Sequence, residues 1–289
     1  MKNKFAAFIL THGRASNVRT YRSLREAGYT GQIYLLVDDL DASLPEYKKR
    51  YGDEVIVFDK QQAVDSTDAC DNLGLHNSVV FARNENFKIA KRIGITHFIQ
   101  LDDDYTIWRW AFTGQGEYLN RVVAITNLDD VFKVGVEALK EMKAKCVCFA
   151  QGGDFIGGGG SGVATIFLRK HWFHRKAMNT FIVSTDNPVK FRGRGNDDVN
   201  TYVECGRRGE LFVTFPQVRV EQPQTQQNSG GLTEMYLKFG TYVKSFYSII
   251  VAPSCVKIGT MGLTPRIHHI IQWKHTVPKI IHERFMKKQ

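Results

Sequence analysis

The sequence predicts an α/β protein with a mixed, Rossmann-type sheet flanked by helices and a mixed C-terminal part. Two observations carry this prediction. Short apolar runs alternate with helical patterns over about the first 110 residues, and polar loops rich in Asp, Gly and Arg follow those runs. A hydrophobic content of 43% and an aromatic content of 12% exclude a disordered chain. We expect one continuous domain with two functional halves, residues 1–145 and 146–289.

The first half alternates strands and helices. Strands are expected over Phe5–Thr11, Gln32–Val37, Val55–Phe58 and His97–Leu101, and helices over Asn17–Ala27, Ser43–Tyr51 and Asn77–Ile93. Phe5–Thr11 is apolar throughout, as a strand buried on both faces is. Asn17–Ala27 ends before Gly28, a common helix stop. Such an order predicts a parallel sheet, whose ligands bind outside the carboxyl ends of its strands.

The second half is less regular. Helices are expected over Leu128–Lys143, Asp197–Arg208, Leu232–Ile250 and Pro278–Gln289, and strands over Cys146–Ala150, Val163–Leu168, Leu211–Phe215 and Arg266–Trp273. The glycine run at residues 157–162 suits a linker or a lid over a bound ligand. The Gln-rich stretch 222–231 suits a polar loop.

Charge divides the chain. Residues 1–145 carry 20 basic and 20 acidic side chains, and residues 146–289 carry 19 basic and 9 acidic ones, so the whole net charge of +10 lies in the second half. No apolar run reaches the roughly 18 residues of a membrane span, and the short N-terminal run lacks a cleavage pattern. Five spread cysteines are typical of reduced thiols. We therefore expect a cytoplasmic protein without a membrane partner.

Three adjacent carboxylates, Asp102, Asp103 and Asp104, follow the fourth strand. They repel one another unless a cation or strong donors neutralise them. Mg²⁺ and Mn²⁺ prefer such oxygen ligands and often share them with substrate phosphates. An acidic turn in solvent is the alternative. The position of the three aspartates directly after a buried strand favours a metal site.

The order of these strands and polar loops resembles the nucleotide-sugar half of GT-A glycosyltransferases over about the first 110 residues. The resemblance implies that Asp102 and Asp104 hold Mn²⁺ or Mg²⁺ on the donor diphosphate, where the ion acts as a Lewis acid. It also implies a nucleotide-sugar donor, for which we expect a UDP-sugar. The implied donor contacts are Thr11, His12, Arg14, Asp39, Arg83 and Asp103. For Arg83, a solvated helix position is an equally weighted alternative.

Two acids, Asp197 and Asp198, lie at the start of the helix expected at Asp197–Arg208. An Asp at a helix start is often only a cap. The stretch that continues from Asp198 to Gly209 and an apolar strand nevertheless resembles the Glu-Asp…Gly region of inverting GT-A enzymes, with Asp197 in place of the usual Glu. The resemblance implies that Asp198 is the general base, which takes the proton of the acceptor hydroxyl, and that Asp197 supports it.

His268 and His269 lie in the late strand pattern. GT-A enzymes often supply a third metal ligand from a C-terminal histidine, which implies that role for one of the pair. Alternation along a strand means that only one of the two should face the site. A structural histidine is the alternative.

Further motifs resemble the TET-associated glycosyltransferases of bacteriophages. They are residues 9–15 (Ile-Leu-Thr-His-Gly-Arg-Ala), 27–31 (Ala-Gly-Tyr-Thr-Gly), 228–233 (Asn-x-Gly-Gly-Leu-Thr), 240–245 (Gly-Thr-Tyr-Val-Lys-Ser) and the histidine pair. The resemblance implies transfer of a sugar to a 5-hydroxymethylpyrimidine, such as 5-hydroxymethylcytosine, in phage DNA. The basic second half suits a polyanionic acceptor, for which we expect contacts from Lys190, Arg192, Arg194 and Arg207.

Other functions fit parts of the sequence. A GT-A enzyme acting on a glycan, lipid or protein is the first alternative. A nucleotidyltransferase shares the sheet and the metal, but it would want a Gly-rich phosphate loop where residues 11–17 hold a single glycine. A basic DNA-binding module without catalysis is the non-enzyme alternative, and it predicts no sugar-nucleotide binding.

Overall fold

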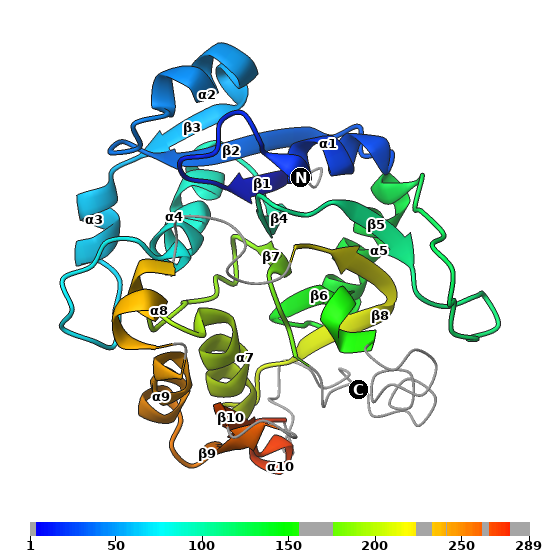
Figure 1. Ribbon diagram of the computed structural model, residues 1–289. Helices are drawn as coiled ribbons and strands as arrows, with labels where there is room; N and C mark the ends of the chain where they lie inside the picture. Colours follow the sequence, from blue (N-terminus) through cyan, green and yellow to red (C-terminus); the bar gives the residue numbers. More distant parts are fainter. Residues whose placement is uncertain (1–3, 156–175, 224–232, 241, 262–265, 278–289) are drawn as a thin grey trace.

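A computed structural model describes residues 4–155, 176–223, 233–240, 242–261 and 266–277 (Figure 1). An eight-stranded sheet forms its centre, in the order β3-β2-β1-β4-β7-β6-β8-β5. The strands are β1 Phe5–Leu10, β2 Gln32–Asp38, β3 Val55–Phe58, β4 His97–Asp102, β5 Ile107–Trp110, β6 Cys146–Gln151, β7 Thr180–Ser184 and β8 Phe212–Glu221. A second sheet pairs β9 Val256–Met261 antiparallel with β10 Arg266–Ile271.

The sheet is mixed, as predicted. β3, β2, β1 and β4 run parallel, so the carboxyl ends of these strands meet at one edge. β7 runs antiparallel to both β4 and β6, whereas β6 and β8 are parallel and β5 joins β8 antiparallel. Strands from both sides of residue 145 therefore belong to the same sheet.

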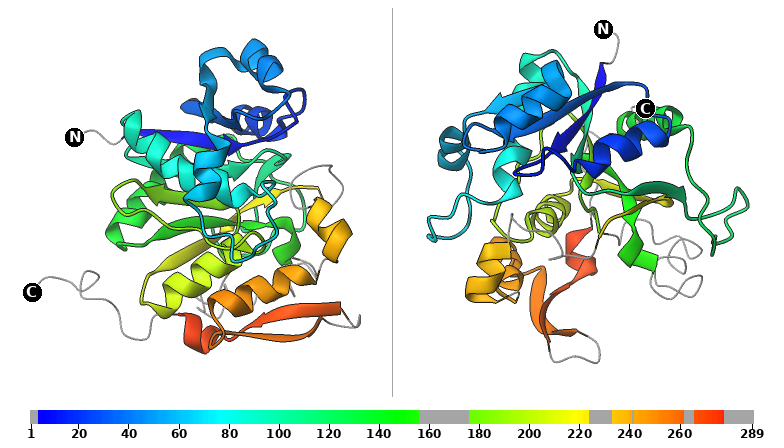
Figure 2. Two further views of the ribbon diagram at one scale, coloured as in Figure 1. Left: turned by 90° about the vertical axis from the view of Figure 1, so that its left-hand side faces the viewer. Right: turned by 45° about the horizontal axis from the view of Figure 1, so that its top comes forward.

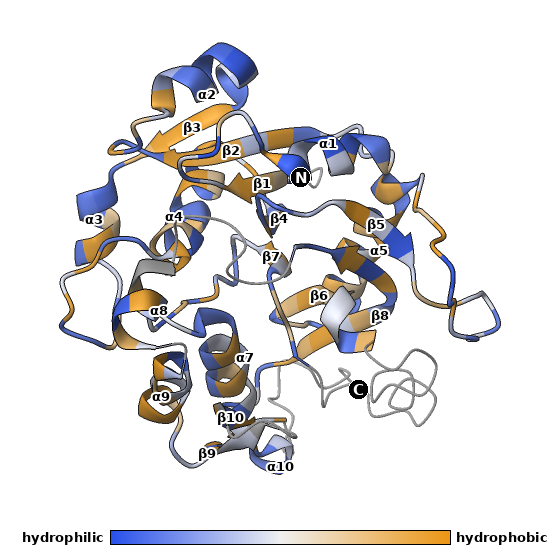
Figure 3. Cartoon of the chain, viewed as in Figure 1, coloured by the Kyte–Doolittle hydropathy of each residue, from blue (hydrophilic) through white to orange (hydrophobic). Residues whose placement is uncertain are grey.

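Helices cover both faces of the sheet (Figure 2). They are α1 Arg19–Glu26, α2 Leu44–Tyr51, α3 Lys60–Asp65, α4 Val79–Arg92, α5 Leu128–Glu141, α7 Asp197–Arg207, α8 Thr233–Phe239, α9 Val243–Val251 and α10 Trp273–Thr276, with 3-10 turns at Gly52–Glu54 and Gly152–Phe155. Side chains of α1, α2 and α5 share one core with alternate sheet residues. Those of α3, α4 and α7 share the other. Figure 3 shows the apolar strands between these layers.

Most predicted elements are confirmed within a few residues, but several short ones were not predicted. β5, β7 and β9 and helix α3 have four to six residues each. The stretch 232–250 is two helices, because Gly240 adopts φ +84° and interrupts the helical backbone. The predicted strand 163–168, the glycine run 157–162, residues 224–231 of the Gln-rich loop and the helix 278–289 lie outside the described residues. Among the described helices, none is long and apolar enough to span a membrane.

Candidate functional site

The loop after β1 is fastened to the end of β4 through Asp103. Thr11 Oγ1 donates to Asp103 Oδ2 at 2.7 Å, and Arg14 Nη1 donates to Asp103 Oδ1 at 2.6 Å. Asp103 is 4% exposed and Thr11 is 8% exposed. Both side chains were predicted to contact the donor, but the structure uses them to join two strand ends.

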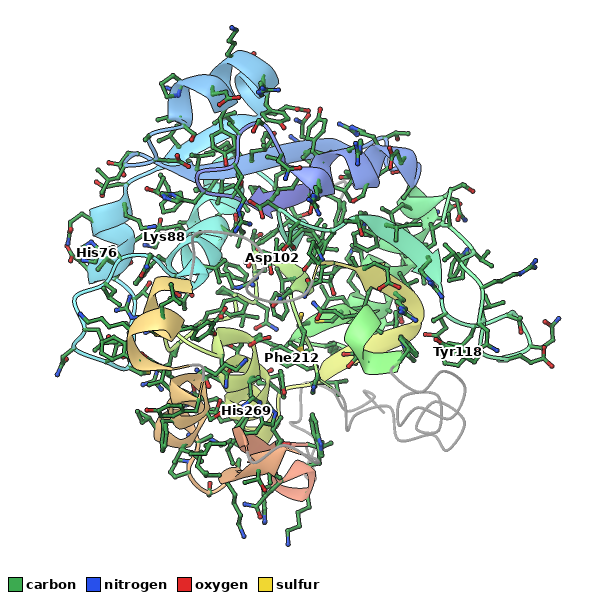
Figure 4. All side chains as sticks on the ribbon, in the orientation of Figure 1. His76, Lys88, Asp102, Tyr118, Phe212 and His269 are labelled. Atoms are coloured by element: carbon green, nitrogen blue, oxygen red, sulfur yellow. The ribbon has the colours of Figure 1, made fainter. Side chains whose placement is uncertain are left out.

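The acidic triplet crowds negative charge at this edge. Burial, followed by the carboxylates of Asp102 and Asp103, raises the pKa of Asp104 to about 6. Burial also raises the pKa of Asp103, although Arg14 and Thr11 lower it in part. Asp102 and Asp104 therefore sit where a cation would relieve repulsion. Figure 4 shows Asp102 at the centre of the molecule.

Arg83 is the buried centre of the site. Its Nε donates to Asp197 Oδ2 at 2.7 Å, and its Nη2 donates to Asp102 Oδ1 at 3.0 Å. Nη2 also lies 3.3 Å from Asn179 Oδ1. Burial opposes the charge of Arg83, but Asp102 and Asp197 outweigh it and raise the pKa of the guanidinium. One cation thus joins the β4 carboxylate to the first turn of α7.

Helix α4 buries Arg83 because the residue lies on its apolar stripe, with Val80, Phe87 and Ala90. Phe181 and Phe191 flank the guanidinium, with ring centroids 5.2 and 5.7 Å from it. The predicted direct donor contact does not fit a side chain that is only 1% exposed. The sequence does carry a sign of this burial, because Arg83 lies at helical spacing from the apolar residues of α4.

The candidate base lies beside this ion pair. Asp197 and Asp198 begin α7, and both are buried. Asp198 Oδ1 accepts the backbone N–H of Val199 at 2.8 Å. Burial raises the pKa of both carboxyl groups, while Arg83 lowers the pKa of each. Asp198 is thus a carboxyl group whose basicity burial increases, as general-base chemistry requires.

The histidine pair is not gathered with the acidic triplet. His269 Nδ1 lies 3.1 Å from the side-chain nitrogen of Asn196, the residue before α7. Burial, followed by the nearby charge of His268, lowers the pKa of His269 to about 3. Figure 4 shows His269 well separated from Asp102. The described residues hold no group of three or more His, Cys, Asp or Glu side chains that could bind a metal ion, and the metal-ligand role of His268 or His269 stays a prediction.

The ends of β1 and β2 form a second polar cluster. His12 Nδ1 lies 2.8 Å from Asp38 Oδ2, which also accepts Lys60 Nζ at 3.3 Å. This contact with Asp38 raises the pKa of His12. The His12 side chain is 56% exposed, and Asp39 is exposed while its Oδ1 accepts the Lys60 backbone N–H. Unlike Thr11 and Asp103, His12 and Asp39 are exposed at this edge of the sheet.

The predicted nucleic-acid contacts divide into two kinds. Arg194 is 3% exposed, and it binds both carboxylate oxygens of Asp71 at 2.8 and 3.0 Å. Arg192 pairs with Asp68 at 2.6 Å and with Glu204 at 3.3 Å. The prediction of a phosphate contact is therefore wrong for Arg194, which is an internal ion-pair partner. Lys190 and Arg207 are exposed, as a contact with a polyanion requires.

Asp71, Tyr247 and Ser78 complete the framework, and no motif had indicated them. The Tyr247 hydroxyl donates to Asp71 at 2.5 Å, and so brings α9 to the same carboxylate as Arg194. Ser78 Oγ donates to the Arg194 carbonyl at 2.9 Å, and it also accepts the Val80 N–H at the start of α4. These partners are remote in sequence, so no local spacing revealed them.

Sheet and site together define a class. Parallel strands deliver an Asp-x-Asp segment to the edge where β1 and β2 end, and an antiparallel strand leads back to a helix that starts with buried acids. The family comparison identifies this class as the glycosyltransferases. The model of the TET-Associated Glycosyltransferase family matches residues 5–231, and the chain belongs to that family. The motifs at 240–245 and 268–269 lie beyond the matched range.

Solved structures resemble the chain at low identity. A mannosyltransferase from Pyrobaculum calidifontis, in complex with GDP-Man and Mn²⁺, is 11% identical, with a TM-score of 0.46 over 88% of this chain and 75% of that one. A glucosyl-3-phosphoglycerate synthase from Mycobacterium tuberculosis, in complex with Mn²⁺, UDP-glucose and phosphoglyceric acid, is 8% identical, with a TM-score of 0.46 over 97% and 89%. No curated protein matches the chain.

Proposed function

We propose that this glycosyltransferase moves a sugar from a nucleotide-sugar donor, a UDP-sugar, to the hydroxymethyl group of a modified base in DNA. The observation that carries the proposal is the bridge that Arg83 makes between Asp102 and Asp197, because it holds a carboxylate of the acidic triplet and the neighbour of the candidate base Asp198 on one buried cation. Family membership supports sugar transfer, and the basic second half supports a polyanionic acceptor.

Asp102 and Asp104 fit a divalent ion that they share with the donor. Asp104 carries a raised pKa because of burial and its acidic neighbours. Two carboxylates with diphosphate oxygens and water make the kind of ligand set that Mg²⁺ or Mn²⁺ accepts. When bound, such an ion stabilises the charge of the leaving diphosphate. His12, Arg14 and Asp39 are the side chains of the β1 and β2 ends that we assign to the nucleotide.

Asp198 is our candidate for the general base of an inverting transfer. In this proposal its carboxylate accepts the proton of the acceptor hydroxymethyl group while the hydroxyl oxygen attacks the sugar carbon. Asp197 and Arg83 hold the start of α7 in place. Because Asp198 is 7% exposed, little water competes for the carboxylate.

The test combines the protein with Mn²⁺ or Mg²⁺, a panel of nucleotide sugars, and DNA with or without 5-hydroxymethylcytosine. The DNA is then digested and its nucleosides are weighed. A hexose or pentose mass gained only on hydroxymethylated DNA supports the proposal, and transfer only to a glycan, lipid or protein overturns it. Asp198→Asn should keep donor binding and lose transfer, with Asp186→Asn, a change at an exposed site, as the matched control.

A further inference from the structure

The exposed side of α8 and α9 combines apolar side chains with lysines. We call it the α8–α9 surface, and it consists of Leu237, Lys238, Tyr242, Phe246 and Ile250. The exposed fractions of its apolar members are 83% for Leu237, 47% for Tyr242, 42% for Phe246 and 61% for Ile250. Figure 3 shows apolar residues on α9. Exposed apolar side chains grouped in this way mark a binding surface.

The aromatic rings are arranged for contact. Tyr242 and Phe246 lie one helical turn apart, with ring centroids 6.4 Å apart and planes at 80°. Within the same two helices, Lys238 Nζ lies 5.3 Å from the centroid of the Phe239 ring, and Lys244 Nζ lies 5.8 Å from that of Tyr236. Rings next to ammonium groups suit a ligand that offers both flat bases and anionic groups.

Charge favours a polyanion here. Residues 235–277 contain four lysines and one arginine and no Asp or Glu. Lys238, Lys257 and Lys274 are exposed. With Glu234 of α8 included, the segment still carries a net charge of +4, which favours an anionic ligand.

The surface is joined to the candidate base. The side-chain nitrogen of Asn196, two residues before Asp198, donates to the Lys244 carbonyl at 2.9 Å and to Ser248 Oγ at 3.2 Å. Gly195 has no side chain at a point where a Cβ would lie 3.1 Å from the Tyr247 ring. Helix α9 therefore packs on the start of α7 through the side that carries Lys244, Tyr247 and Ser248, and Tyr242, Phe246 and Ile250 lie on its exposed side.

We propose that the acceptor DNA strand lies across the α8–α9 surface, with unpaired bases stacked on Tyr242 and Phe246 and phosphates beside Lys238. The inference rests on the proposed DNA acceptor and adds to it the residues that hold the strand. It also moves the acceptor contact from Arg194, which is buried, to side chains of α8 and α9, among which Tyr242 belongs to the 240–245 motif.

The test measures binding of a fluorescein-labelled, single-stranded oligonucleotide by anisotropy, without donor. The double variant Y242A/F246A removes both rings on which bases would stack, so we expect its Kd for the oligonucleotide to rise at least about tenfold. Phe246→Trp keeps an aromatic ring and should keep the wild-type Kd. Lys238→Gln should reduce the salt dependence of log K by about 0.7. Val134→Ala and Lys133→Gln, changes at exposed sites of α5, are the matched controls and should change nothing.

Wild-type Kd in Y242A/F246A overturns the inference. It is also overturned if the same variant loses binding to phosphatidylserine vesicles and keeps binding to the oligonucleotide. Because anisotropy needs no sugar transfer, a chain that binds DNA through Tyr242 and Phe246 but modifies no base overturns only the proposed function. A chain that modifies DNA with an unchanged KM for DNA in Y242A/F246A overturns only the α8–α9 surface.

Discussion

Arg83 and Asp197 form a buried ion pair between α4 and α7, with 2.7 Å between Nε and Oδ2. Arg83 is 1% exposed and Asp197 is 6% exposed. The same guanidinium reaches Asp102 at the end of β4. Among the described residues no second arginine forms an ion pair with either carboxylate, so the position of Arg83 sets the distance between the end of β4 and the start of α7.

Arg83→Ala should therefore destabilise the fold and abolish transfer. Removal of one partner from a buried ion pair costs about 3–5 kcal/mol, and here it leaves two carboxylates without their cation. Denaturant unfolding measures the loss, and the nucleoside mass assay measures transfer. Arg92→Ala, an exposed change on the same helix, is the control. A stable Arg83→Ala protein that still transfers sugar would contradict the assigned role.

Metal should stabilise the protein in a pH-dependent way. The pKa of Asp104 is raised from its usual value of 3.8 to about 6, mainly by burial, so the folded protein favours the protonated carboxyl group. The contribution of Asp104 to stability is therefore present below about pH 4 and is lost as the pH rises through 6. Mn²⁺, which binds the carboxylate form, should raise Tm more at pH 7 than at pH 5.

Asp104→Asn removes the titrating group, so its Tm should respond little to Mn²⁺ at either pH. Asp53→Asn, an exposed acidic position, should keep the wild-type response. Thermal unfolding with and without Mn²⁺ at the two pH values tests this. An equal rise of Tm at pH 5 and pH 7 in the wild type would refute the assignment of the metal to Asp104.

Two arginines of the second half should behave in opposite ways. Arg194→Gln leaves Asp71 without its bidentate partner inside the protein, so we expect a loss of about 3 kcal/mol in the free energy of unfolding. Arg207→Gln lies at the exposed end of α7 and should leave unfolding unchanged. On double-stranded DNA it should lower the salt dependence of log K by about 0.9. Denaturant unfolding and salt titrations of DNA binding are measured for both variants. The two roles would be contradicted if Arg207→Gln lowered the free energy of unfolding and Arg194→Gln did not.

A fourth prediction concerns β5 and β8. Arg109 and Arg219 face each other across the two strands, and both contact Glu221, at 3.5 and 2.8 Å. Glu221→Gln leaves two neighbouring cations with one neutral partner, and it should cost about 1–3 kcal/mol in the free energy of unfolding. Adding Arg219→Gln should restore part of that loss, because like charges opposite each other destabilise a strand pair. Urea titration of the single and double variants tests the coupling, and simple additivity would argue against it.

The sequence was informative where a local pattern determines structure. β1, β2 and β4 are mostly apolar runs buried on both faces; β2 and β4 end at Asp38 and Asp102, and β1 ends at Leu10, one residue before Thr11. β5 and β7 escaped prediction because each has only four or five residues and depends on hydrogen bonds to distant strands. Short segments of this kind carry too little periodicity to be distinguished from loops.

The site shows the same division. The acidic triplet and the acids of α7 were found by their position after a strand and before a helix. Arg83 and Arg194 were assigned to ligands, because a sequence does not show which cation is enclosed by carboxylates from distant segments. The partners of Arg194, at Asp71 and Leu75, lie more than 100 residues away.

β4 lies between β1 on one side and β7 on the other, and β7 comes from residues 180–184. A fragment that stopped at residue 145 would therefore leave the β4 edge bare, with its backbone N–H and C=O groups open to pairing with other chains. Because residues 1–145 and 146–289 contribute strands to one sheet, we expect that neither half folds when it is expressed alone. The sheet is complete only when β7 pairs with β4, about 80 residues earlier in the chain. Because pairing between distant segments is slow, we expect this step to slow folding.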